Sequence, residues 1–177
     1  MISPSIPSIE HKPVRRGAVA ALALLACIAL SLSSARADAV ASANAAYARG
    51  DYIGAVKLLT PLALHGNARA QAFLGFMYEN GYGAPQGYVA AADFYIQAAT
   101  SGNPFGQAML GLMYDKGHGV PQDFVLAYKW LNLAAARAAK HERGYFLRLR
   151  NAVASKMSPA QIAQGQYLAL CWAPGSP

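Results

Sequence analysis

The sequence predicts an all-α protein: an antiparallel helix-pair solenoid with a two-helix cap at its C-terminal end. The first observation is repetition, because LGFMYENGYGAPQ at residues 74–86 returns 36 positions later as LGLMYDKGHGVPQ at residues 110–122. A fixed period of about 20–50 residues is typical of solenoids. The second observation is that apolar residues in each copy recur at the spacing of one helix face. The third is that no stretch alternates convincingly at the period of two that strands require.

Residues 1–37 are expected to be a secretory signal peptide and no part of the fold. A basic start precedes an almost wholly apolar stretch at residues 17–32, and Ala35-Arg36-Ala37 has the small-x-small pattern of a cleavage site. A helix over the apolar stretch would be about 24 Å long, shorter than the hydrocarbon core of a bilayer, which is about 30 Å. We therefore expect cleavage after Ala37 and export to the periplasm. A retained N-terminal membrane anchor is the alternative.

The solenoid is predicted to span residues 38–136. It contains a half repeat at residues 46–67, then full repeats at residues 68–103 and 104–139, about two and a half units in all. Each full repeat is interpreted as two helices joined by a corner.

The first helix of each repeat is predicted from one apolar face. Leu74, Met77, Tyr78 and Gly81 follow the i, i+3, i+4, i+7 spacing of such a face. Gly75 stands where a bare backbone would let a neighbouring helix approach closely. The equivalent positions of the next repeat are Leu110, Gly111, Met113, Tyr114 and Gly117.

The corner after the first helix is expected to depend on a pair of glycines, Gly81 with Gly83 and Gly117 with Gly119. Glycine adopts the left-handed conformation without a Cβ penalty, so at least one glycine of each pair should have a positive φ. The spacing does not match the GxGxxG dinucleotide fingerprint, which also needs a preceding strand. No cofactor is therefore expected.

The second helix of each repeat is expected to start near residue 87 or its equivalent. Asp123 can cap this helix in the last repeat, because its carboxylate can accept from exposed backbone N–H groups. Gly87 is a weaker cap at the same place in the preceding repeat. Trp130 is the large aromatic residue of the last such helix, where the preceding repeat has Phe94.

Residues 137–172 are expected to form a basic cap of two helices, followed by a tail at residues 173–177. The first is an amphipathic helix at residues 143–157. The second starts at Ser158-Pro159, with serine as the cap and proline in the first turn, and ends near Trp172.

The cap is where the positive charge of the chain gathers. Residues 137–156 contain several Lys and Arg side chains against Glu142 alone, so we expect a weak contact with an anionic envelope surface. Export and the lack of regularly spaced stacking aromatics argue against nucleic acid. Cys171 would be the one cysteine left after cleavage; we expect a packed thiol, with an intermolecular bridge as the alternative.

These segments resemble Sel-1-like repeats (SLR), which are relatives of tetratricopeptide repeats. The pattern is Leu-Gly-x-x-Tyr-x-x-Gly-x-Gly, followed by an acidic residue and then by Ala and Trp at helical spacing. GDYIGAVKLLTPLALHGN and KMSPAQIA are similar to the opening and closing segments of short exported bacterial members. The resemblance implies an α-solenoid that binds other proteins as a scaffold or adaptor. Its motif residues are Leu74, Gly75, Tyr78, Gly81, Gly83, Leu110, Gly111, Tyr114, Gly117, Gly119, Asp123 and Trp130.

A protein partner is expected to bind the concave face formed by the first helices. The residues that should face it lie off the core stripe: Phe73, Phe76, Asn80, Met109, Leu112 and Lys116. The alternative is that these side chains pack against neighbouring helices.

No catalytic residue and no metal site is predicted. His118 lies in a corner, and neither His65 nor His141 has a Cys or carboxylate at ligand spacing. We consider two alternatives to a non-catalytic scaffold. One is a β-lactam-binding or hydrolysing enzyme, as in cysteine-rich relatives whose repeat cysteines this chain lacks. The other is a structural envelope protein held by its basic cap.

Overall fold

The computed structural model describes residues 39–175, and this part of the chain is helical with no strand. Residues 39–48 are helical. They are followed by α2 (Tyr52–Leu64), α3 (Ala68–Asn80), α4 (Tyr88–Thr100), α5 (Pro104–Lys116), α6 (Phe124–Arg137), α7 (Lys140–Ala154) and α8 (Pro159–Leu170). The predicted fold class, an all-α solenoid of helix pairs, is confirmed. The expected signal peptide lies outside the described residues.

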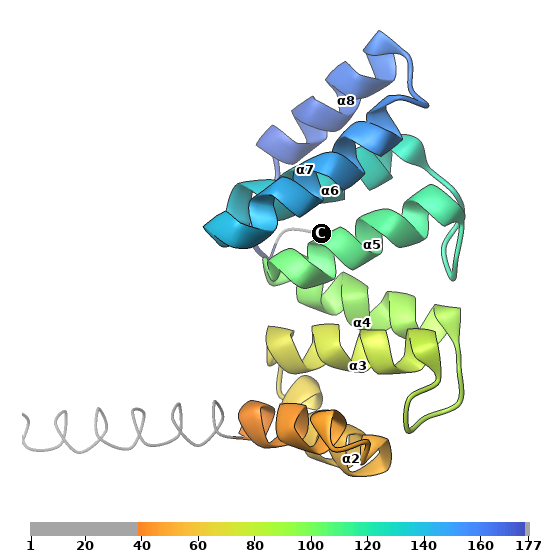
Figure 1. Cartoon of the computed structure of the whole chain (residues 1–177). Helices are drawn as coiled ribbons and strands as arrows, with labels where there is room; N and C mark the ends of the chain where they lie inside the picture. The colour runs from red at the N-terminus through yellow and green to blue at the C-terminus, as the bar shows by residue number, and fades with distance from the viewer. Residues whose placement is uncertain (1–38, 176–177) are drawn as a thin grey trace, which may run out of the picture. The chain divides into compact units, whose positions relative to one another are not determined.

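The helices stack in chain order, each packing against the next from α2 to α7 (Figure 1). The first helices of the two full repeats, α3 and α5, also contact each other directly. At the C-terminal end both α7 and α8 pack on α6. This is the arrangement of stacked antiparallel pairs in which each unit covers the core of its neighbour.

Polar side chains start most of the helices. Asp123 accepts from the backbone N–H groups of Val125 and Leu126 at 2.8 and 2.9 Å, and Asn67 and Asn103 cap α3 and α5 in the same way. Gly87 caps α4 without a side-chain hydrogen bond. The sequence expectation of one strong and one weak cap on the second helices agrees with this geometry.

All four corner glycines have positive φ. Gly81 and Gly117 end their helices in the left-handed conformation, with φ of 71° and 72°. Gly83 and Gly119 have φ of 72° and 70°, and a Cβ on either would meet the backbone carbonyl of a residue in the preceding second helix, Tyr52 or Tyr88. Each corner therefore requires glycine for its conformation and, at the second position, for close backbone contact as well.

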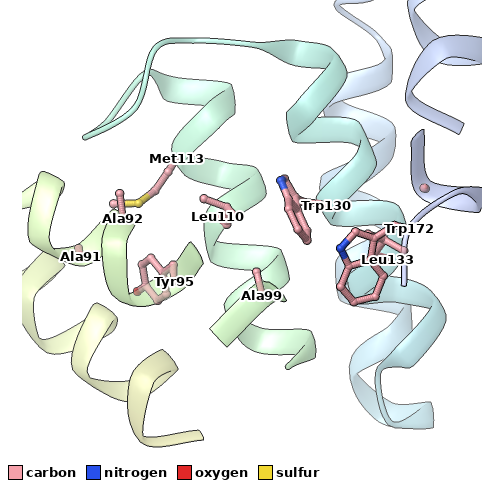
Figure 2. Close-up of a cluster of buried hydrophobic side chains, with 10 residues drawn as sticks. Ala91, Ala92, Tyr95, Ala99, Leu110, Met113, Trp130, Leu133 and Trp172 are labelled. Carbon is pink, nitrogen blue, oxygen red and sulfur yellow. The ribbon is translucent and has the colours of Figure 1, made fainter. Parts of the chain in front are cut away.

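The helix pairs approach closely because small residues line the contacts. A Cβ on Gly75 would lie 2.7 Å from the Tyr95 ring, and one on Gly111 would lie 2.8 Å from Cγ of Leu131. Figure 2 shows the central core, in which Tyr95 from α4 lies near Leu110 and Met113 of α5, and Trp130 from α6 lies near Trp172. Alanines fill much of the remaining space, which permits short interhelical distances.

The cap differs in detail from its expected form. Helix α7 runs from Lys140 to Ala154, whereas a helix at residues 143–157 is expected. Lys140 and Arg143 therefore both lie in its first turn. Helix α8 begins as expected, since Ser158 accepts from the backbone N–H of Gln161 and the Gln161 side chain bonds back. It ends at Leu170, before Trp172.

Several contacts attach the cap to the solenoid. Lys156 Nζ lies 2.8 Å from the carboxylate of Asp115. The sequence alone predicts no contact for Asp115. The Trp172 ring lies 5.9 Å from the Trp130 ring, and the guanidinium of Arg137 lies 4.4 Å from the centre of the Trp172 ring. The backbone N–H of Gly175 donates to the carbonyl of Thr100 at 2.9 Å, so the tail folds back onto α4.

Cys171 is exposed, so the expectation of a packed thiol is wrong. It follows the last residue of α8, where Trp172 and not Cys171 turns into the core. A residue that immediately precedes a buried side chain at the end of a helix points to a different side of the chain.

Candidate functional site

A groove of about 890 Å³ opens along the first helices of the solenoid. Its lining comes from residues 39–48, from α3, from the first turn of α5 and from the start of α7. The lining residues are Val40, Asn44, Arg69, Ala72, Phe73, Phe76, Asn103, Pro104, Phe105, Ala139 and Glu142. The groove therefore lies on the first helices of both full repeats, α3 and α5, and is bordered by residues 39–48 and by the start of the cap.

The apolar floor of the groove is formed on α3. Leu74 and Met77 of this helix are buried in the core, and each has a phenylalanine one position before it, Phe73 and Phe76. One position along a helix is a rotation of about 100°, so both rings are only half-buried. They line the groove from this intermediate position.

Both phenylalanines are held by other rings. Tyr47 lies 5.3 Å from Phe73 and 6.0 Å from Phe76 by ring centroids, with edge-on geometry. Tyr82, from the corner after α3, lies 5.8 Å from Phe76 and stacks on Tyr52 at 4.9 Å. Aromatic pairs at these distances favour edge-to-face or offset contacts, so the floor is formed before any ligand enters.

Tyr47, whose ring contacts both phenylalanines, has a raised pKa. Burial, together with Tyr82 and Tyr52 nearby, raises the pKa of Tyr47 above its usual value of about 10. The phenol of Tyr47 is therefore protonated at ordinary pH, and Tyr47 supports the two phenylalanine rings as a neutral side chain.

The opposite wall is formed by the start of α5. Asn103 caps the helix by accepting from the backbone N–H of Gly106 at 2.8 Å, and Pro104 occupies the first turn. The ring of Phe105 is 38% exposed and stands edge-on to Tyr95, 6.4 Å away. Phe105 is therefore anchored on one side and free on the side that lines the groove.

The groove also has charged residues in its lining, Arg69 from α3 and Glu142 from α7. Both are exposed, and they have opposite signs. The chemistry of the groove is thus three aromatic rings with one cation and one anion, which suits a segment that is apolar with polar flanks.

The six residues proposed from the sequence do not lie on one surface. Phe73 and Phe76 line the groove. Met109 is half-buried and packs against two core clusters, one built mainly from α4, α5 and α6 and the other from α5, α6 and α7. Leu112 is also half-buried and lies outside the lining, while Asn80 and Lys116 are exposed at the far ends of α3 and α5. The side-chain amide of Asn80 donates to the carbonyl of Phe76 at 2.8 Å.

Sequence reasoning missed Arg69, Phe105 and Glu142. A 36-residue shift places Arg69 on Phe105, so these residues occupy equivalent first-turn positions of α3 and α5. The signal available in the sequence for Phe105 was an aromatic residue directly after an Asn-Pro helix start. Glu142 gave no such signal, because the register of the repeat is lost before the cap.

Part of the basic charge of the cap is used internally. Arg137 covers Trp172, Arg150 donates to Asn132 at 3.1 Å, and Lys156 pairs with Asp115. Lys140, Arg143 and Arg148 are exposed on α7 and leave one side of this helix positively charged.

Within residues 39–175 no three His, Cys, Asp or Glu side chains gather closely enough to hold a metal ion. The ring of His118 lies 4.5 Å from that of Tyr88. None of the helices described by the structure is long and apolar enough to cross a membrane.

Comparison with known proteins gives the following similarities. The family model of the Sel1 repeat matches residues 68–103 and 104–138. A protective antigen present in uropathogenic Escherichia coli strains, described as displaying an SLR fold, is 30% identical with a TM-score of 0.67, and the match covers 77% of this chain and 30% of the antigen. A Sel1 repeat protein from Oxalobacter formigenes is 37% identical with a TM-score of 0.46, and the match covers 48% of this chain and 64% of that protein. No curated protein matches the chain.

The chain thus spans about a third of the length of the antigen with which it shares its fold. The two matched segments coincide with the helix pairs α3–α4 and α5–α6.

Proposed function

We propose that this chain, a Sel1-repeat protein, is a non-catalytic scaffold that holds a segment of a partner protein in the groove between its first helices. Repeat solenoids of this type mediate protein–protein interaction through their concave surfaces. The observation that supports the proposal most strongly is the groove itself, with Phe73 and Phe76 on its floor and Phe105 on the opposite wall.

The geometry favours a peptide with apolar anchors as the ligand. Interfaces obtain most of their binding free energy from a few aromatic or otherwise large side chains in a desolvated centre. The floor rings are fixed by Tyr47 and Tyr82, so little side-chain entropy is lost when a ligand covers them. Arg69 and Glu142 can orient a segment whose charges are complementary.

Phe105→Ala is the variant that best tests whether a partner binds in the groove. Phe76→Ala disturbs the aromatic cluster around Tyr47, whereas the Phe105 ring is partly exposed and can be removed with less effect on folding. The matched control is Tyr145→Ala, because Tyr145 is a 49% exposed aromatic residue on α7 that does not line the groove.

The experiment is crosslinking in native cells, followed by purification of the chain and identification of attached proteins. We expect the wild type and Tyr145→Ala to capture the same partner in similar amounts. Phe105→Ala should capture at least about tenfold less of that partner. Equal capture by all three proteins, with unchanged helicity, would contradict binding in the groove.

The proposal includes export. Support comes from the basic, apolar and small-residue order of residues 1–37, which lie outside the described part of the chain. N-terminal sequencing of protein from native cells is expected to begin at Asp38. A start at Met1 or at Cys27 would contradict cleavage after Ala37.

A second candidate function is attachment to an anionic envelope surface through α7. It is favoured by the exposed side chains of Lys140, Arg143 and Arg148 on one helix. Attachment of this kind is electrostatic and is weakened by salt. Release from envelope fractions by about 1 M salt, with retained helicity, would support it.

A further inference from the structure

A hollow of about 280 Å³ lies between α6 and α7, and it shares no lining residue with the groove of the first helices. Its lining residues are Asn132, Ala135, Ala136, Arg143, Leu147 and Arg150. Those of α6 follow the i, i+3, i+4 spacing of one helix side, and those of α7 follow the i, i+4, i+7 spacing. The two helices pack on each other, so two facing sides enclose the hollow. Short alanines on one side and long arginines on the other leave the space between them.

Neutral amides fix the guanidinium of Arg150 in the lining of this hollow. Its Nη1 donates to Oδ1 of Asn132 at 3.1 Å, and its Nε and Nη2 donate to Oδ1 of Asn151 at 3.2 and 2.9 Å. These bonds leave one N–H on each terminal nitrogen for a ligand. Because both acceptors are uncharged, the positive charge of Arg150 is held in place but is not neutralised.

Arg143 brings a second positive charge to the same hollow. It is exposed, lies in the first turn of α7 and forms no ion pair within residues 39–175. The negative end of the α6 dipole and the positive end of the α7 dipole both lie beside the hollow, so their effects largely cancel. Helices α6, α7 and α8 contain one acidic residue, Glu142, and it lines the other groove. The hollow therefore gathers two guanidinium charges with no carboxylate of these helices in its lining.

We propose that this hollow is a binding site for a phosphate group. The planar fork of an arginine donates two parallel hydrogen bonds to two oxygens of a phosphate. A phosphate monoester carries a charge of about −1.5 to −2 at neutral pH, which matches two guanidinium groups, whereas a carboxylate needs only one. A bound phosphate also offsets the repulsion between the two cations.

Such a site differs from attachment through the whole basic side of α7, and it does not depend on peptide binding in the groove. Attachment by diffuse charge depends on the number of cations, so Arg143 and Arg148 would contribute equally. A site depends on their positions. Arg148 is also exposed on α7, but it lies outside the lining, with its guanidinium 5.9 Å from the Tyr145 ring. Arg148→Gln is therefore the matched control for Arg143→Gln, because each variant removes one positive charge from an exposed position of the same helix.

The first test is a calorimetric titration of the full chain with inorganic phosphate, with sodium chloride of equal ionic strength as the reference. We expect the wild type to bind with a Kd of about 1 mM or below. Arg148→Gln should bind with similar affinity and Arg143→Gln at least about tenfold more weakly, because only Arg143 donates to the ligand. Circular dichroism checks that both variants keep the helicity of the wild type. The proposal is wrong if the two variants bind alike, or if the wild type shows no binding beyond that of chloride up to about 20 mM phosphate.

Vesicles then distinguish two sources of the phosphate group, a lipid headgroup and a soluble compound. The probe is an equimolar mixture of phosphatidylcholine and phosphatidic acid, whose headgroup is a phosphate monoester. The reference is an equimolar mixture of phosphatidylcholine and phosphatidylglycerol, whose headgroup is a diester.

Stronger binding to the phosphatidic acid vesicles, lost in Arg143→Gln and displaced by inorganic phosphate, would support the site and identify a lipid headgroup as the source. Binding of inorganic phosphate without binding to vesicles would support the site and identify a soluble phosphate compound. Vesicle binding that Arg143→Gln and Arg148→Gln weaken equally would contradict the site, because attachment would then depend on diffuse charge alone.

Discussion

The two full repeats have nearly identical corners, yet their acidic residues have different partners. Gly81 and Gly117 have the same left-handed conformation, and after each corner a glutamine side chain donates to a carbonyl of the first helix, at 2.9 and 2.7 Å. Glu79 and Asp115 occupy equivalent positions in this geometry. Glu79 accepts from the hydroxyl of Tyr95 in its own repeat at 2.8 Å, whereas Asp115 pairs with Lys156 of the cap.

The outward faces of the first helices differ in the same way. Phe73 and Phe76 of α3 line the groove, while Met109 packs against two core clusters that both include residues of α6, and Leu112 stays outside the lining. Repetition therefore determines the backbone and the corner, because those depend on residues inside one unit. An outward side chain is covered by residues of the next unit. The unit after α5–α6 is the cap, α7 and α8, which is not a repeat.

The largest expected effect concerns the corners. Gly83→Ala should cost about 3 kcal/mol of unfolding free energy: about 1 for the left-handed conformation and about 2 for the clash of its Cβ with the carbonyl of Tyr52. Gly81→Ala should cost about 1 kcal/mol, since its Cβ would lie 3.4 Å from Gln86. Urea denaturation measures both values. Equal costs at the two positions would show that close backbone contact is unimportant.

The next-largest effect is expected at Tyr95, whose equivalent in the following repeat is Leu131. Burial and the neighbouring Glu79 raise the pKa of Tyr95 well above its usual value of about 10. Folding thus favours the neutral phenol. This contribution to stability is complete below about pH 10 and is lost above it, by about 1.4 kcal/mol per pH unit.

Tyr95→Phe should cost about 1 kcal/mol at neutral pH, because the carboxylate of Glu79 loses a donor. Its stability should also fall less steeply than that of the wild type above about pH 10. Unfolding curves at several pH values provide the measurement. The control is Tyr145→Phe, at an exposed tyrosine, whose pH dependence should equal that of the wild type. An unchanged slope for Tyr95→Phe would contradict the buried, neutral phenol.

The smallest effect is expected at the contact between the last repeat and the cap. The side chain of Lys156 is about half exposed, so its ion pair with Asp115 should contribute less than about 1 kcal/mol. Lys156→Ala should lower the midpoint of thermal unfolding slightly, and the difference should shrink in about 0.5 M salt. A large loss that does not depend on salt would indicate that the stem of Lys156 packs on Phe124 more than its charge pairs.

The sequence was sufficient for the repeat and for parts of the cap. Corner glycines, the Asp123 cap and the start of α8 follow from local rules about conformation and hydrogen bonding. The floor of the groove also followed, since Phe73 and Phe76 stand beside the buried stripe of α3, but Phe105 on the opposite wall did not.

The rest depended on packing between distant elements. Met109 packs against two core clusters that both include residues of α6, and Glu142 reaches the groove from the first turn of α7. Cys171 is exposed because Trp172 takes the core position at the end of α8. No local rule relates those residues to the segments that they contact.

The central claim is that a partner binds the groove near the start of α5, and the most direct test compares two positions on that one helix. A photoreactive phenylalanine analogue is introduced at position 105, which lines the groove, or at position 112, which does not. After irradiation in native cells, we expect a covalent adduct with the partner from position 105 and little or none from position 112. Adducts from position 112, with none from position 105, would contradict the account.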